Sequence, residues 1–145
     1  MTAKAYLEQA NYLDDTIASH LREISRIRST YRALPSCEPR ERVQTSRDPD
    51  PPFVNAVIKV LDLEAKINAE IDRLVDLKEQ IRETIDAVPD TREQLVLRKW
   101  YLEGRNPKTA PREIAREMGV NEKTIRRWHA RGLSKVILPE FPITI

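Results

Sequence analysis

The chain has 145 residues, of which 33% are charged, 6% are aromatic and only three are glycines. This composition favours exposed helices over a compact α/β core, and no apolar run is long enough to cross a membrane. The single cysteine, Cys37, excludes an intrachain disulfide, and the first residues lack the apolar segment of a secretory signal. We therefore expect an intracellular, helical protein.

The net charge of +2 conceals two halves of opposite sign. Residues 1–90 carry 13 basic and 17 acidic side chains, whereas residues 91–145 carry 12 basic and 6 acidic side chains. This asymmetry suggests that the two halves have different roles and that the basic half meets a polyanion.

An apolar stripe with alternating spacings of four and three begins near the N-terminus. Its members are Tyr6, Ala10, Leu13, Ile17, His20, Ile24, Ile27, Tyr31 and Leu34. This heptad pattern predicts one helix over about residues 2–34, with a narrow face that packs against another helix. We interpret His20, the one polar member, as a half-exposed residue of that seam rather than as a ligand.

A second stripe predicts the partner helix over about residues 52–88. Its members are Phe53, Val57, Val60, Ile67, Ile71, Leu74, Ile81, Ile85 and Val88, and the pattern slips at Glu64 and Lys78. A proline-rich loop over residues 35–51 is long enough for the chain to reverse. We therefore expect residues 1–89 to form an antiparallel, coiled-coil-like hairpin. Pairing within one chain is favoured, and pairing between chains stays open, so the protein is expected to be a monomer or a homodimer.

Residues 90–104, DTREQLVLRKWYLEG, predict a shorter helix that Asp90 or Thr91 caps and Gly104 ends. Its apolar residues lie on more than one side, as expected of the central helix of a small bundle. They are Leu95, Val96, Leu97, Trp100, Tyr101 and Leu102.

Residues 113–132, EIAREMGVNEKTIRRWHARG, have the spacing of a helix-turn-helix. The first helix is expected to open at Pro111 and to end at Gly119, where the backbone needs a positive φ. Asn121 is expected to cap the second helix. The side chains expected to be buried are Ile114, Ala115, Met118, Ile125 and Trp128.

The outward face of this second helix is basic. At 100° per residue it presents Lys123, Arg127, Ala130 and Ser134, with Arg126 on one edge and Thr124 and Arg131 on the other. Four cations and no carboxylate occupy the face, since Glu122 lies off its centre. Cations at the edges suit phosphates and cations at the centre suit guanine edges. The face therefore indicates binding in a DNA major groove rather than an ordinary basic hairpin.

The segments LVLRKWYLEG and EIAREMGVNEKTIRRWHARGL resemble region 4 of bacterial sigma factors, the module that reads the −35 promoter element. With MTAKAYLEQ, RVQTS and LEAKINAEIDRLVDLKEQI, the chain up to about Leu138 is similar to a family of small transcriptional regulators of phages and prophages of Gram-positive bacteria. The resemblance implies base contacts from Glu122, Lys123 and Arg127 and backbone contacts from Arg126 and Arg131. It also implies double-stranded DNA and host RNA polymerase as partners, in the cytoplasm of the host cell.

The chain departs from this family at two places. The segment RNPKTAP makes the loop before the motif longer than in the family, so the resemblance assigns no phosphate contact to Arg105 or Lys108. Gly132 stands where the recognition helix normally continues, and it either ends that helix early or permits a close helix crossing. Nothing in the chain resembles the DNA-melting region of a complete sigma factor.

Other functions fit the sequence less well. It has no phosphate-cradling glycine loop and no Cys/His cluster, so we expect neither catalysis nor a cofactor or metal. A phage terminase small subunit, which would form a ring and bind a packaging site, is the main alternative, and a protein-binding adaptor is a third. The predicted organisation is a helical hairpin over residues 1–89, a DNA-binding domain over 90–138 and a tail over 139–145.

Overall fold

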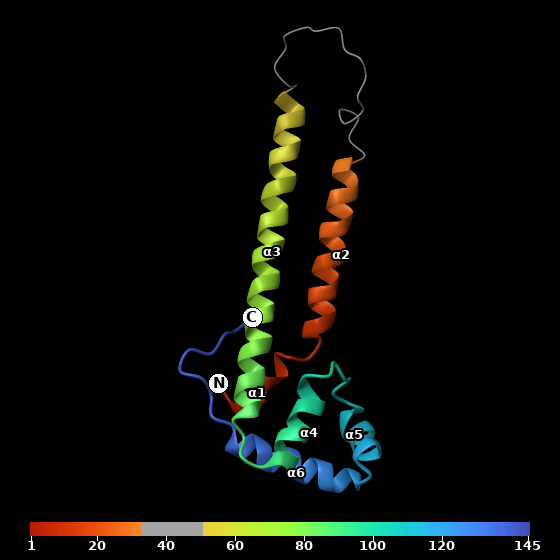
Figure 1. Cartoon of the computed structure of the whole chain (residues 1–145), viewed down its shortest axis with the longest axis vertical. Helices are drawn as coiled ribbons and strands as arrows, with labels where there is room; N and C mark the ends of the chain where they lie inside the picture. The colour runs from red at the N-terminus through yellow and green to blue at the C-terminus, as the bar shows by residue number, and fades with distance from the viewer. Residues whose placement is uncertain (33–50) are drawn as a thin grey trace. The chain divides into compact units, whose positions relative to one another are not determined.

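The computed structural model describes residues 1–32 and 51–145, with side chains for 1–30 and 54–145. This part of the chain is all-helical, as predicted (Figure 1). Its helices are α1 (Ala3–Glu8), α2 (Leu13–Arg32), α3 (Pro51–Asp86), α4 (Thr91–Tyr101), α5 (Ala110–Met118) and α6 (Glu122–Lys135). Apart from Pro51, the predicted loop with Cys37 lies outside the described residues, as do Leu34 and the side chains of Tyr31 and Phe53. No helix in the described ranges has the length and apolarity needed to span a membrane.

The chain divides into two compact units whose limits differ from the predicted ones. The larger unit comprises residues 1–17 and 73–145, and the smaller unit comprises residues 18–72. The predicted boundary between residues 89 and 90 therefore falls inside the larger unit. The physical reason is a shared core, because α1, the end of α3 and α4 bury their apolar side chains together.

The predicted continuous helix over residues 2–34 is wrong near its start. The chain turns at residues 9–12, between α1 and α2, and Tyr12 takes a left-handed φ of 63°. That conformation costs about 1–2 kcal/mol for a residue other than glycine. The turn allows both Tyr6 and Leu7 to be fully buried, and each buried apolar side chain contributes about 1.5–3 kcal/mol. The heptad stripe had placed only Tyr6 on the buried side.

Two apolar cores lie on different sides of α4. The first core consists of Tyr6, Leu7, Ala10, Leu13, Leu74, Leu77, Ile81, Ile85, Val88, Leu97 and Tyr101. The second core consists of Val96, Ala110, Ile114, Ala115 and Ile125. Helix α4 is thus the central helix that the sequence predicts, although Leu95 is 39% exposed. Asp90 caps α4, since its side chain accepts hydrogen bonds from the backbone N–H groups of Arg92 and Glu93.

The predicted C-terminal tail is bound within the larger unit. Gln80 Nε2 donates to the carbonyl of Phe141 at 3.0 Å, and Gln80 Oε1 accepts from the N–H of Ile143 at 2.9 Å. Gln9 Nε2 donates to the carbonyl of Ile143 at 3.2 Å, and the half-buried Ile143 side chain packs on the first core. Residues 141–143 therefore link α3 to the segment after α1.

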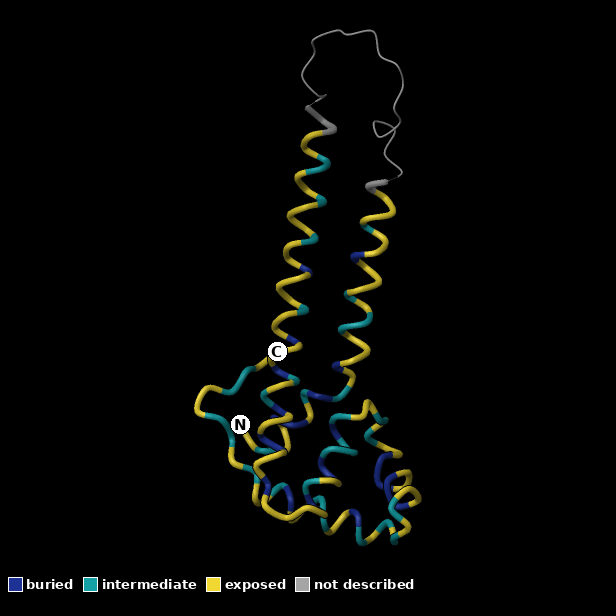
Figure 2. Tube along the Cα trace, in the orientation of Figure 1, coloured by how far each residue is buried: buried dark blue, intermediate teal, exposed yellow. Residues whose placement is uncertain are grey.

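The smaller unit buries few side chains in its described part (Figure 2). Ile24 and Ile67, both members of the predicted stripes, are only 6% and 4% exposed. The Arg28 guanidinium binds Glu64 Oε1 at 2.6 Å, and His20 Nδ1 lies 3.7 Å from a carboxylate oxygen of Glu70. As the residue number rises along α2, the number of the paired residue in α3 falls, so the paired segments of α2 and α3 are antiparallel. A continuous coiled-coil seam over the whole hairpin stays a prediction.

Candidate nucleic-acid interface

Helices α5 and α6 are joined by the short turn that the sequence predicts. Gly119 ends α5 with a φ of 66°, and a Cβ at this position would meet nothing within 4 Å. The glycine is therefore needed for its backbone conformation and not for space. Asn121 caps α6, because its side chain accepts a hydrogen bond from the N–H of Lys123 at 3.4 Å.

Helix α6 is held along its length by α4. Ile125 is fully buried in the second core, and Leu133, further along α6, packs on the first core. At Gly132 the two helices cross closely, since a Cβ there would lie 3.0 Å from Leu97 Cδ1 and 3.4 Å from Glu93 Cβ. Gly132 thus permits a tight crossing and does not end α6, which continues to Lys135.

A buried carboxylate lies at the same crossing. The side chain of Glu93 is only 4% exposed, and Lys135 Nζ lies 2.7 Å from its Oε2. A buried charge is costly unless an opposite charge accompanies it. The Lys135 ammonium therefore balances the charge of the Glu93 carboxylate where the end of α6 packs on α4.

The outward face of α6 is exposed, as the helical projection predicts. Its central and edge positions that are exposed are Lys123, Arg126, Arg127, Ala130, Arg131 and Ser134, whereas Thr124 is half-buried. Glu122 is half-buried at the N-terminal end and binds the Arg126 guanidinium at 2.9 Å. The structure thus brings all five predicted contact residues onto one helix.

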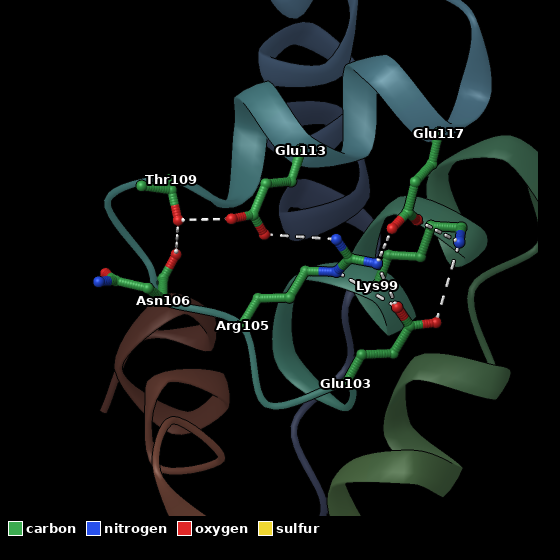
Figure 3. A network of polar contacts seen from close by, with 7 residues as sticks. All are labelled: Lys99, Glu103, Arg105, Asn106, Thr109, Glu113 and Glu117. Atoms are coloured by element: carbon green, nitrogen blue, oxygen red, sulfur yellow. Dashed lines mark hydrogen bonds and ion pairs between the residues drawn. The ribbon is translucent and has the colours of Figure 1, made fainter.

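Carboxylates pair with Lys99 of α4 and with Arg105 of the following loop (Figure 3). Arg105 binds Glu117 at 2.5 Å and Glu103 at 2.7 Å, and its third partner is Glu113 at 3.5 Å. Lys99 also binds Glu117, at 2.9 Å. The hydrogen bond from Arg105, and after it the one from Lys99, holds the pKa of the Glu117 carboxyl below its ordinary value. Arg105 is therefore committed to fixing the long loop onto α5 and is not free to contact a phosphate.

The remaining cations of this region are left without counter-charges. In residues 91–145 five of the six carboxylates form ion pairs. The cations from the loop to α6 that make no ion pair with any described residue are Lys108, Arg112, Arg116, Lys123, Arg127 and Arg131. Sequence reasoning missed Arg112 and Arg116. Their spacing of four along α5 was the available signal, since it places both on one side of a helix.

The prediction that Trp128 is buried on the inner side of α6 is wrong in part. It packs on the second core but is only half-buried. The Arg92 guanidinium lies 5.8 Å from the centre of its ring, which is within the range of a cation–π contact. The indole therefore lies at the edge of the core, partly covered by a cation from α4.

His129 of α6 is held among aromatic side chains of α4. Its ring stacks on Trp100 with 3.8 Å between centroids, and its Nε2 is hydrogen-bonded to the Tyr101 hydroxyl at 2.8 Å. Burial, followed by the charges of Lys4 and Arg126, lowers the pKa of His129 to about 4. The imidazole is therefore neutral at pH 7.

No family model, no curated protein and no solved structure matches the chain. Within residues 1–32 and 51–145 no group of three or more His, Cys, Asp and Glu side chains is arranged to hold a metal ion.

Proposed function

We propose that the chain binds double-stranded DNA in a sequence-specific manner, with α6 in the major groove. The observation that carries this proposal is the charge distribution of the larger unit. Ion pairs occupy Arg98 and Lys99 of α4 and Arg105 of the long loop. The exposed arginines of α5, and the cations on the outward face of α6 apart from Arg126, make no ion pair with any described residue. Most cations of this face have no ion-pair partner, and α4 supports the helix along its length. Such a face suits binding to a rigid polyanion.

The positions along α6 suggest a division of roles. Lys123 and Arg127 lie at the centre of the outward face, from which they reach guanine edges. Arg126 and Arg131 lie at its edges, where the walls of the groove bring phosphates close. Glu122, at the start of the helix, accepts a hydrogen bond from a cytosine amino group. Arg112 and Arg116 on α5 add further phosphate contacts.

The biological role that we propose is regulation of transcription from phage promoters. It rests on the resemblance of α4–α6 to sigma region 4, which also supports host RNA polymerase as a partner and the host cytoplasm as the location. We propose no catalytic activity and no cofactor.

The proposal is tested by selecting DNA bound by the whole chain from a random pool. One enriched sequence should emerge, and it should occur near promoters of the phage genome. The logarithm of the binding constant should fall linearly with the logarithm of the salt concentration, with a slope of about −0.9 for each phosphate contact. An unenriched pool would contradict sequence-specific binding. Light scattering separates the main alternative, since a large ring would indicate a terminase small subunit and a monomer or dimer a regulator.

A further inference from the structure

A cleft of about 380 Å³ lies between α1 and the recognition helix α6, within the larger unit. Lys4 and Glu8 of α1 form one wall, and Arg126 and His129 of α6 form the other. Trp100 is among the aromatic side chains that line it. We call this space the α1–α6 cleft. None of the proposed DNA contacts so far involves α1, although that helix packs against α6.

Two cations from different helices, Lys4 and Arg126, line the cleft. Lys4 and Arg126 both lie close enough to His129 to disfavour its protonated form. Arg126 also stands at the edge of the outward face of α6, where a groove wall would bring a DNA strand. A phosphate that enters the cleft would therefore meet an ammonium from α1 and a guanidinium from α6 together.

Each cation has a local carboxylate, and both pairs are exposed. Lys4 Nζ lies 3.8 Å from Glu8 Oε1, with side-chain exposures of 64% and 48%. The Arg126–Glu122 pair at 2.9 Å is similarly exposed, at 61% and 44%. Solvent-exposed pairs one helical turn apart are weak. Lys4 and Arg126 can therefore exchange their carboxylates for a phosphate, and Glu8 acts as a competitor for Lys4.

We propose that the α1–α6 cleft binds a backbone phosphate of the DNA, which Lys4 and Arg126 share. This inference rests on the proposed function, and it makes α1 a part of the DNA-binding surface. It also assigns opposite roles to two neighbouring residues of α1, since Lys4 attracts the phosphate and Glu8 opposes it.

The test compares three variants of the whole chain: Lys4→Gln, Glu8→Gln and, as a control in the smaller unit, Lys59→Gln. Fluorescence anisotropy with the selected DNA at several salt concentrations measures affinity and salt slope. Lys4→Gln should weaken binding by about 3-fold to 10-fold and reduce the salt slope by about one unit. Glu8→Gln should tighten binding by about 3-fold because it frees Lys4, and Lys59→Gln should change neither quantity. A cleft that only supports the fold would not produce opposite effects from Lys4 and Glu8.

An NMR titration of His129 gives a second readout that separates the possible sources of the phosphate. Bound DNA should raise the pKa of His129 in the wild-type chain but not in Lys4→Gln. If inorganic phosphate alone raises it while DNA does not, the cleft binds a free anion and the DNA assignment is overturned. If the wild type binds the selected DNA but Lys4→Gln and Glu8→Gln behave like Lys59→Gln, the cleft makes no phosphate contact. If the wild-type chain binds no DNA at all, the proposed function itself is refuted.

Discussion

Replacing Gly132 with alanine should destabilise the larger unit, although alanine is the better helix former. In an exposed helix the change would stabilise the protein by about 1 kcal/mol. At this crossing the new Cβ would lie 3.0 Å from Leu97 Cδ1 and 3.2 Å from Leu97 Cγ. Leu97 is fully buried and would have to shift by a few tenths of an ångström to accept the new Cβ, so overpacking should cost about 1–3 kcal/mol. The net loss should be about 1 kcal/mol.

The assay is urea unfolding of the whole chain, followed by circular dichroism. Ala130→Gly, two residues earlier on the exposed face, is the matched control, and it should cost about 1 kcal/mol through helix propensity alone. Gly132→Leu should be more harmful than Gly132→Ala, because its larger side chain meets the same neighbours. If Gly132→Ala stabilises the protein by as much as Ala130→Gly destabilises it, α6 does not cross α4 closely at this point.

Three further outcomes are expected. Ile24→Asp should lower the free energy of unfolding by about 3 kcal/mol, because it places an unpaired charge among buried side chains of the smaller unit. Leu21→Asp, at an exposed position, should lower it by less than about 1 kcal/mol. Thermal melts that rank the two variants equally would contradict the assignment of Ile24 to the buried face of α2. The free energy of unfolding should fall as the pH decreases from 6.5 towards 4, because the lowered pKa of His129 means that only the unfolded chain takes up its proton there. This contribution is fully present above pH 6.5, amounts to at most about 3 kcal/mol, and should disappear in His129→Gln. Arg105→Ala should destabilise the protein by about 2 kcal/mol, because three carboxylates lose their shared partner, and an unchanged melt would show that the ion cluster does not hold the loop.

The helices α4, α5 and α6 could be predicted because their signals are local. Asp90 and Asn121 cap the helices that they were expected to cap, and Gly119 has the positive φ that the turn requires. The exposed face of α6 followed from helical periodicity alone. Each of these features depends on residues within about one helical turn of one another.

The features that the sequence did not reveal depend on residues far apart in the chain. Tyr6 and Leu13 are buried on the predicted stripe, but the chain reaches these positions through a turn at Tyr12 that a periodic pattern cannot show. The binding of residues 141–143 depends on hydrogen bonds from Gln9 and Gln80. Arg105 is bound by Glu103 of the loop itself and by two carboxylates of α5, an arrangement that depends on the path of the loop, which no motif specifies.

The central claim is that the outward face of α6 reads bases, and Arg127→Ala tests it most directly. Binding isotherms on the selected site and on its single-base mismatches, each at several salt concentrations, compare this variant with Arg126→Ala. Arg127→Ala should lose about 1–3 kcal/mol of discrimination at one base pair, while its non-specific binding falls much less. Arg126→Ala should weaken all sequences equally and lower the salt slope by about one unit. If Arg127→Ala also weakens every sequence by the same factor, α6 does not read bases and the proposed docking in the major groove is wrong.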